Sequence, residues 1–158
     1  MEKIIIAAVS KNNVIGNKGK IPWHSKDELK HFQETTTGFP VIMGRKTWQT
    51  INNPLKNRIN IIISRNKSFW VYMDKVIVFN SPEETFEFCQ NSGIEKAFII
   101  GGGQIFQETI GIADSIILSR MDFETKGDVF FPEIDTEVWK EISNQKFTDF
   151  TVHYYIRK

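Results

Sequence analysis

The chain has 158 residues, of which 41% are hydrophobic and 25% are charged, and its formal net charge at pH 7 is +1. This length suits one domain, residues 1–158, that buries a core of its own. The near-balance of charge gives no broad electrostatic case for nucleic acid or an anionic membrane as a partner. We therefore expect neither partner, and any anion site has to be local.

Cysteine usage and the N-terminus indicate where the protein works. Cys89 is the only cysteine, so no disulfide forms within the chain, and no Cys or His lies near it at the spacing of metal ligands. The apolar run at 4–9 is too short to span a bilayer and lacks the longer apolar region of a secretory signal. We expect a cytoplasmic protein without a metal site.

Strands and helices alternate along the chain. Residues 3–9 are an almost continuous Ile, Val and Ala run, which is typical of a strand buried on both faces. The clearest helix, 81–91, begins with a serine cap, a proline and a glutamate three residues after the cap. The other expected elements are, in chain order, a helix at 25–35, a strand at 40–43, a loop turning into a helix at 44–48, strands at 59–64, 75–79 and 96–100, a tight turn at 101–103, a helix at 104–110, a strand at 116–119 and an alternating ribbon at 138–150 and 151–156.

This order predicts an α/β protein with a mostly parallel central sheet, helices on both faces and a C-terminal antiparallel strand pair. Ligands of such sheets bind outside the carboxyl ends of the strands. We therefore expect ligand-binding residues in the loops after Val9, Met43, Ser64, Phe79 and Ile100.

Glu28 has two interpretations. It shares a helix face with Phe32, and a carboxylate on an apolar face is costly to bury unless a cation or strong hydrogen bonds meet it. That makes it a candidate proton donor or a clamp for a flat, amidine-like ligand. Alternatively, Ser25 and Glu28 form a capping box, with Asp27 favoured in the first turn by the helix dipole.

Basic and glycine-rich segments follow several predicted strands. Gly44-Arg45-Lys46-Thr47 and Ser64-Arg65 combine cations with hydroxyls, which suits phosphate binding. Gly101-Gly102-Gly103-Gln104 lacks the spaced dinucleotide fingerprint, so it is either a tight packing turn or part of a cofactor site. Together these loops suggest a dinucleotide. Arg58, on the loop before a strand, either presents a cation to an anionic substrate tail or is an ordinary surface arginine.

Four segments resemble one family in order and spacing. They are Ile21-Pro22-Trp23 with Glu28 and Phe32, Val41-Ile42-Met43-Gly44-Arg45-Lys46-Thr47-Trp48, Ile100-Gly101-Gly102-Gly103, and Gly127-Asp128-Val129-Phe130-Phe131-Pro132. The chain resembles the dihydrofolate reductases over about 4–156. The resemblance implies reduction of 7,8-dihydrofolate to 5,6,7,8-tetrahydrofolate for one-carbon metabolism, with NADPH as cofactor. It also implies binding of antifolates such as methotrexate and trimethoprim-like diaminopyrimidines, and we expect a monomer.

The resemblance assigns substrate roles to particular positions. Glu28 matches the acid that holds the pterin edge and helps to protonate N5, Trp23 the tryptophan that orders a nearby water, and Ser119 the hydroxyl that supports the acid. Arg58 matches the arginine that pairs with the glutamate carboxylate of the substrate. The residues expected to form the wall around the pterin and benzoyl groups are Ile6, Ala8, Leu29, Phe32, Ile51, Leu55, Ile100 and Phe106.

The cofactor positions follow in the same way. Two cations at the place of the 2′-phosphate favour NADPH over NADH, and the family carries a cis peptide at Gly101-Gly102. The loop at 12–21 is expected to close over the nicotinamide. The residues expected to bind the cofactor are Ala8, Ile15, Gly44, Arg45, Lys46, Thr47, Ser64, Arg65, Gly101, Gly102, Gly103, Gln104 and Ile105.

Three positions depart from the commonest family pattern. Gln104 stands where some bacterial members have an arginine, Phe106 where many have tyrosine, and Glu28 where bacteria usually have aspartate.

Two other functions stay open. A pyrimidine deaminoreductase of riboflavin synthesis shares the glycine turn and the cofactor edge but not the Pro-Trp segment with its acid. A pterin-binding module without catalysis is expected to have lost the acid.

Overall fold

The computed structural model describes residues 1–158, which form ten strands and four helices. The strands are β1 (Glu2–Val9), β2 (Val14–Gly16), β3 (Val41–Gly44), β4 (Asn60–Ile63), β5 (Val76–Phe79), β6 (Lys96–Gly101), β7 (Ser115–Met121), β8 (Val129–Phe130), β9 (Trp139–Lys146) and β10 (Phe150–Arg157). The helices are α1 (Lys26–Thr36), α2 (Arg45–Ile51), α3 (Pro82–Asn91) and α4 (Gly103–Thr109). Each predicted helix and strand is present, with ends that differ by a few residues at most.

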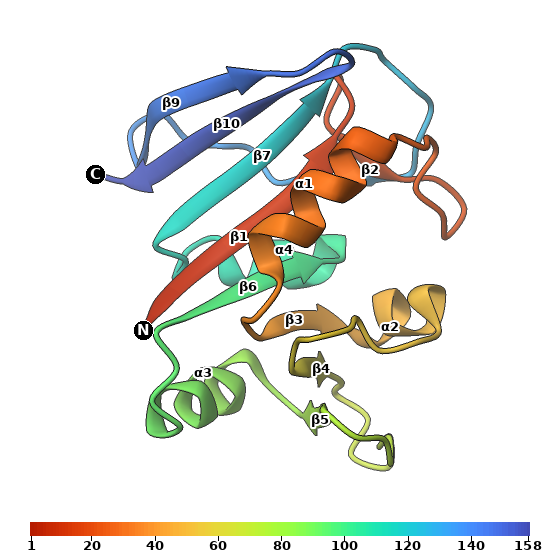
Figure 1. Ribbon diagram of the computed structural model, residues 1–158, viewed down its shortest axis with the longest axis vertical. Coiled ribbons are helices and arrows are strands. Elements are labelled where there is room, and N and C mark those ends of the chain that lie inside the picture. The colour runs from red at the N-terminus through yellow and green to blue at the C-terminus, as the bar shows by residue number, and fades with distance from the viewer.

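Eight of the strands form one central sheet in the order β5-β4-β3-β6-β1-β7-β10-β9 (Figure 1). The pairs from β5 to β7 are parallel, whereas β10 runs antiparallel to both β7 and β9. This arrangement confirms the predicted parallel sheet with a C-terminal antiparallel pair. It also brings the carboxyl ends of β1, β3, β4, β5 and β6 to one edge.

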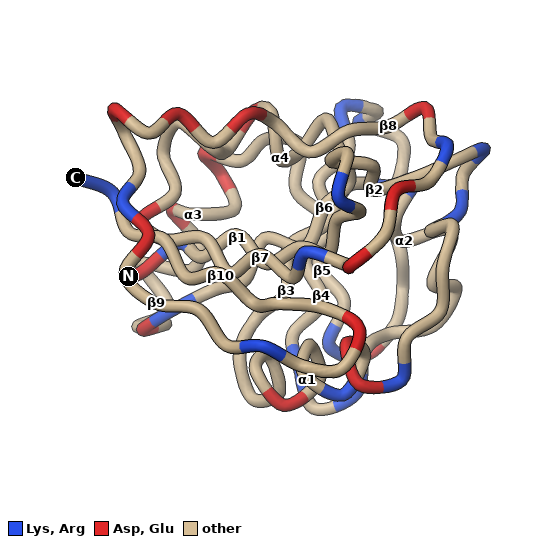
Figure 2. The backbone as a smooth tube through the Cα atoms, turned by 90° about the horizontal axis from the view of Figure 1, so that it is seen from above, with Lys and Arg blue, Asp and Glu red and all other residues tan.

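Helices cover both faces of the sheet because successive side chains of a strand point to opposite faces. On β1, Ile5 and Val9 pack with residues of α3 and α4 in one core cluster. Ile4 and Ile6 belong to a second cluster, against which α1 and α2 pack. Seen from above, α1 lies on one side of the sheet and α3 and α4 on the other, with charges of both signs spread around the outside (Figure 2).

The start of α3 shows why this helix was predictable. Ser81 Oγ accepts a hydrogen bond of 3.1 Å from the Glu84 backbone N–H, and Pro82 occupies the first helical position. The Glu84 carboxylate reaches back to accept a 3.0 Å hydrogen bond from the Asn80 backbone N–H. Side chains therefore satisfy one free N–H of the first helical turn and the N–H of the residue before the cap.

A second, two-stranded sheet joins β2 to β8, and sequence reasoning did not predict it. The close approach depends on Gly127, since a Cβ at this residue would lie 2.1 Å from Val14 Cγ1 and 2.7 Å from the Gly16 carbonyl oxygen. The predicted loop at 12–21 is therefore partly regular, with a β-bridge between Asn17 and Lys20 beyond the strand.

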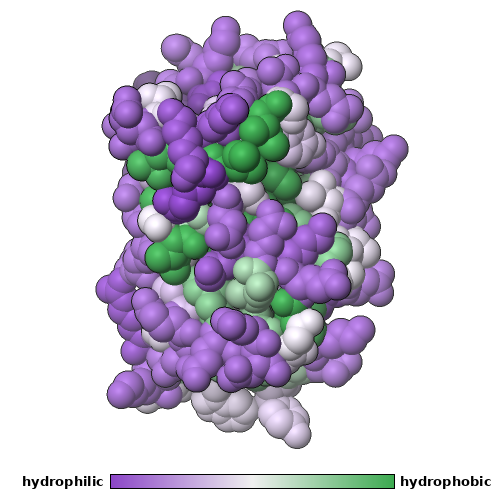
Figure 3. All heavy atoms as spheres, turned by 90° about the vertical axis from the view of Figure 1, so that its left-hand side faces the viewer, coloured by the Kyte–Doolittle hydropathy of each residue, from purple (hydrophilic) through white to green (hydrophobic).

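The outer surface is mainly hydrophilic on the face shown in Figure 3, where hydrophobic side chains gather in small patches. None of the four helices combines the length and the hydrophobicity that a membrane-spanning helix requires.

Candidate active site

A long cleft of about 950 Å³ lies where the carboxyl ends of the parallel strands meet. Its volume is in the range typical of small-molecule and cofactor sites. Residues from the ends of β1, β3, β4 and β6, and from the segment after β5, line it together with the starts of α2, α3 and α4. The residues expected at the substrate or cofactor that line it are Ala8, Ile15, Gly44, Arg45, Lys46, Thr47, Ile51, Ser64, Arg65, Ile100, Gly102, Gly103, Gln104, Ile105 and Phe106.

Tight packing at two glycine turns shapes the cleft. A Cβ at Gly44 would lie 3.1 Å from Ile105 Cγ1, and one at Gly102 would lie 3.3 Å from Thr47 Oγ1. The peptide bond between Gly101 and Gly102 is cis, as the family resemblance implied. Gly101 does not line the cleft; it is buried, and a Cβ there would lie 3.2 Å from the Phe106 ring.

The cleft is rich in groups that bind anions. Arg45, Lys46 and Arg65 line it alongside the hydroxyl groups of Thr47 and Ser64. The Arg45 guanidinium also lies 5.8 Å from the centre of the Phe69 ring, which positions it by a cation–π contact. Because phosphate groups are bound by such cations and hydroxyls, the donor set fits a phosphorylated nucleotide cofactor.

Sequence reasoning missed several cleft residues. Asn80 donates a hydrogen bond of 2.8 Å from Nδ2 to the Ser64 carbonyl, which ties the ends of β4 and β5 together. Glu108, on α4, accepts hydrogen bonds from Arg65 and Gln104. Asn80 directly follows a predicted strand, and Glu108 is four residues after Gln104 on one helix face, so both had a usable signal. Val129 of β8 lies in a segment that carries the family resemblance, but no site role was assigned to it.

Glu28 is a buried carboxyl group, only 9% exposed. Burial raises its pKa from the usual 4.5 to about 7, and the negative charge of Asp149 adds to the rise. Ser25 caps α1, since its Oγ accepts a 3.2 Å hydrogen bond from the Glu28 backbone N–H. The return bond from the Glu28 carboxylate to the Ser25 backbone is not formed. Only the serine half of the capping-box interpretation is therefore correct.

Three buried polar side-chain atoms of the protein have no hydrogen-bond partner. Ser119 Oγ is buried without a hydrogen-bond partner, as are His31 Nε2 and Asp149 Oδ1. Ser119 lies on the α1 side of β7, because Ile117 and Met121, two residues before and after it, pack in clusters on that side. Trp23 packs against the Met121 cluster as well. Buried groups without partners indicate room for water or a ligand.

The expected substrate residues divide into two sets. Ile6, with Phe32, Ile51, Leu55 and Ile100 packed around it, belongs to one apolar cluster between α1, α2 and the sheet. Leu29 differs, because it is 49% exposed and lies outside that cluster. The expected residues that do not line the long cleft are Ile6, Trp23, Glu28, Leu29, Phe32, Leu55, Arg58 and Ser119.

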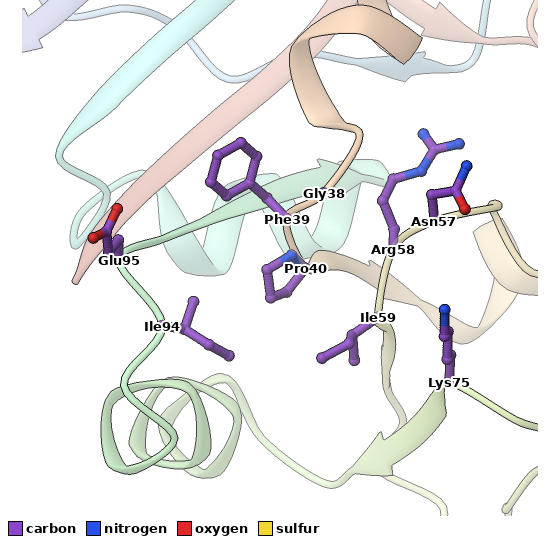
Figure 4. Close-up of a pocket in the computed structure, with 9 residues that line it drawn as sticks. All are labelled: Gly38, Phe39, Pro40, Asn57, Arg58, Ile59, Lys75, Ile94 and Glu95. Carbon is purple, nitrogen blue, oxygen red and sulfur yellow. The ribbon is translucent and has the colours of Figure 1, made fainter.

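Arg58 is buried, with 7% of its surface exposed, so its interpretation as a surface arginine is wrong. Its Nε donates to the Lys56 carbonyl at 2.8 Å and its Nη1 to Thr36 Oγ1 at 2.9 Å. The residue also borders a smaller cavity of about 320 Å³ at the amino ends of β3 to β6. Ile94 lines the other side of that cavity, and the Arg58 guanidinium points away from it (Figure 4).

The parallel sheet has a basic cleft at its carboxyl edge and a buried acid on α1. Together these features define an α/β enzyme with a nucleotide-cofactor cleft. The family model for dihydrofolate reductase matches residues 3–157. The chain therefore belongs to the dihydrofolate reductase family.

Individual relatives agree with this membership. The chain is 37% identical over 138 residues to dihydrofolate reductase type 3 of Salmonella typhimurium, covering 87% of this chain and 83% of that protein. It is 38% identical over 136 residues to the dihydrofolate reductase of Haemophilus influenzae, covering 86% and 82%. The solved dihydrofolate reductase of Enterococcus faecalis, complexed with NADP(H) and RAB-propyl, superposes with a TM-score of 0.89 at 30% identity, covering 99% of this chain and 96% of that one.

Proposed function

We propose that this protein reduces 7,8-dihydrofolate to 5,6,7,8-tetrahydrofolate, with NADPH as the hydride donor. The observation that carries the proposal is Glu28, a buried carboxyl group with a pKa of about 7 that makes no return bond to its helix cap. A group with this pKa is able to hold or release a proton at neutral pH. The two alternative functions, a pyrimidine deaminoreductase and a pterin-binding module without catalysis, do not account for a buried acid that follows the Pro-Trp segment.

The cleft residues hold the cofactor. Arg65 and Ser64 bind the 2′-phosphate of the adenosine half, and Arg45, Lys46 and Thr47 bind the other phosphate and ribose groups. The walls near the nicotinamide come from Ala8, Ile15, Gly44, Gly102, Gly103, Gln104 and Ile105, whereas Gly101, also expected at the cofactor, is buried outside the cleft. When bound, NADPH supplies the hydride, and the protein supplies orientation and a site shielded from water.

Glu28 and its neighbours hold the pterin. Its carboxylate pairs with the amidine-like edge of the ring, and the proton that N5 requires comes through the water that Trp23 orders. Ser119, whose Oγ has no protein partner, supports the acid and the ring edge by hydrogen bonding. The apolar cluster around Ile6, with Ala8, Leu29 and Phe106, packs against the ring and benzoyl groups.

Arg58 binds the glutamate carboxylate of the substrate. Its bonds to Thr36 and Lys56 fix the guanidinium, so little side-chain freedom is lost when the substrate binds. Antifolates such as methotrexate and diaminopyrimidines occupy the same pterin site. The protein acts as a single-domain monomer in the cytoplasm. A mainly hydrophilic surface on the face in Figure 3 and a free buried thiol at Cys89 support this part of the proposal.

The test is to follow NADPH absorbance with dihydrofolate added and with methotrexate as the inhibited control. We expect NADPH consumption that requires dihydrofolate and stops with methotrexate. Reduction of a ribosylaminopyrimidine without any reduction of dihydrofolate would instead support the deaminoreductase. Tight methotrexate binding without turnover would support the non-catalytic pterin-binding module.

A further inference from the structure

A carboxylate bridges two sides of the cofactor cleft. Glu108, on α4, accepts hydrogen bonds through Oε1 from Arg65, which follows β4, and from Gln104 Nε2 at 3.0 Å. All three residues line the cleft. The Glu108 side chain is 29% exposed and that of Arg65 is 73% exposed. An acid therefore already engages one nitrogen, Nη2, of a guanidinium that the cofactor phosphate is expected to need.

We propose that Glu108 sets the degree of preference for NADPH over NADH, because its carboxylate competes with the 2′-phosphate for Arg65. The inference rests on the proposed function, which places that phosphate at Arg65. The 2′-phosphate must displace the Glu108 carboxylate from the guanidinium when NADPH binds. NADH has no such phosphate, so it binds without breaking the pair.

The surroundings of the pair make this competition specific to Arg65. Gln104 is neutral and its amide donates to the same Oε1 atom, so it holds the Glu108 carboxylate in place without neutralising its charge. The Arg45 guanidinium lies over the Phe69 ring instead, and no ion pair joins Lys46 to an acid. Glu108 thus lowers the affinity of the cleft for the additional phosphate mainly through one cation.

The direct test replaces Glu108 with Gln, which keeps the shape and the ability to accept from Gln104. Dissociation constants of the purified protein for NADPH and for NADH are measured by calorimetry, without substrate. The ratio of the NADH to the NADPH dissociation constant should rise about two- to five-fold, as expected for release of a partly exposed ion pair. The rise should become smaller at high salt, which screens exposed charges.

Two further variants show whether the effect runs through Arg65. Glu87→Gln makes the same change of charge at an exposed residue of α3 that does not line the cleft and forms no ion pair, and the ratio should stay at the wild-type value. In the Arg65→Ala background, Glu108→Gln should no longer change the ratio, because interacting residues are non-additive in a double-mutant cycle.

The outcomes separate this inference from the proposed function. An unchanged ratio in Glu108→Gln, or weaker binding of NADPH, overturns the competition; the latter would mean that Glu108 orients Arg65 for the phosphate. An equal change in the Glu87→Gln variant also overturns it, since a general charge effect would then suffice. In these cases the wild-type protein still binds NADPH and reduces dihydrofolate. Failure of the wild-type protein to bind either nucleotide would contradict both proposals.

Discussion

Arg58 Nη1 donates a hydrogen bond of 2.9 Å to the Thr36 hydroxyl, which joins the loop before β4 to the last residue of α1. Burial also lowers the pKa of Arg58 from its usual value, although a guanidinium stays charged at neutral pH. A buried cation that meets only neutral acceptors has the capacity to bind an anion. This is the arrangement that a carboxylate-binding arginine requires before its ligand arrives.

Arg58→Ala should weaken dihydrofolate binding far more than NADPH binding. Loss of a charge-assisted pair at a buried site costs on the order of 2–4 kcal/mol. Thr36→Val, which removes only the hydroxyl that accepts from Arg58, should weaken dihydrofolate binding by about 1 kcal/mol. Calorimetry with each ligand checks both values, and equal losses for the two ligands in Arg58→Ala would contradict the assignment.

Glu28 should make the protein less stable as the pH rises. Its pKa is about 7 in the folded protein and 4.5 as its ordinary value, so between these pH values the folded state binds more protons than the unfolded state. Stability therefore falls as the pH rises through this window. Glu28→Gln removes the effect and should raise the free energy of unfolding at pH 8 by up to about 3 kcal/mol, with less gain at pH 5.

Denaturant melts at the two pH values check this prediction. Asp27→Asn is the matched control, because Asp27 is the exposed neighbour of Glu28 in the same helical turn. The prediction is wrong when Glu28→Gln and Asp27→Asn change stability by the same amount at both pH values.

Much of the fold was predictable because the parallel strands are nearly continuous apolar runs and α3 has strong local caps. The β2–β8 pair was not, since it depends on two short segments far apart in sequence and on the room left by Gly127. Local patterns predict contacts within a segment, but they do not specify which distant short segments pair.

Glu28 and Glu84 show the same limit at the candidate site. Both stand three residues after a serine that caps a helix, so the two local sequences predict the same capping box. Glu84 reaches back to the backbone before its helix, whereas Glu28 is buried near Asp149, a residue far along the chain. Only tertiary packing separates the structural glutamate from the candidate acid, and the family resemblance carried that information where the local pattern did not.

Asp149→Asn should move the pH dependence of catalysis towards acid. Burial is the main reason for the raised pKa of Glu28, and the Asp149 charge is the second. Without that charge, Glu28 should lose its proton at a lower pH while its pKa stays above 4.5. The falling limb of kcat/KM against pH should therefore move to lower pH. Asp122 is the control, because it is an exposed acid whose backbone N–H donates to the Asp149 carbonyl, and Asp122→Asn should leave the limb in place. No shift in Asp149→Asn would show that the two carboxyl groups are not coupled.

Glu28→Gln should leave the fold intact and greatly reduce turnover of dihydrofolate at neutral pH. Glutamine keeps the shape of the side chain, and the cap bond from the backbone N–H to Ser25 is retained, so a purely structural role predicts near-normal activity. The catalytic role predicts a large loss, because an amide cannot pair as an anion with the pterin edge or promote protonation of N5. Activity should recover as the pH falls, since solution then protonates the substrate without help. Steady-state rates from pH 5 to 8, with Asp27→Asn as the control, measure this; loss of turnover in Asp27→Asn but not in Glu28→Gln would identify Asp27 as the functional carboxylate.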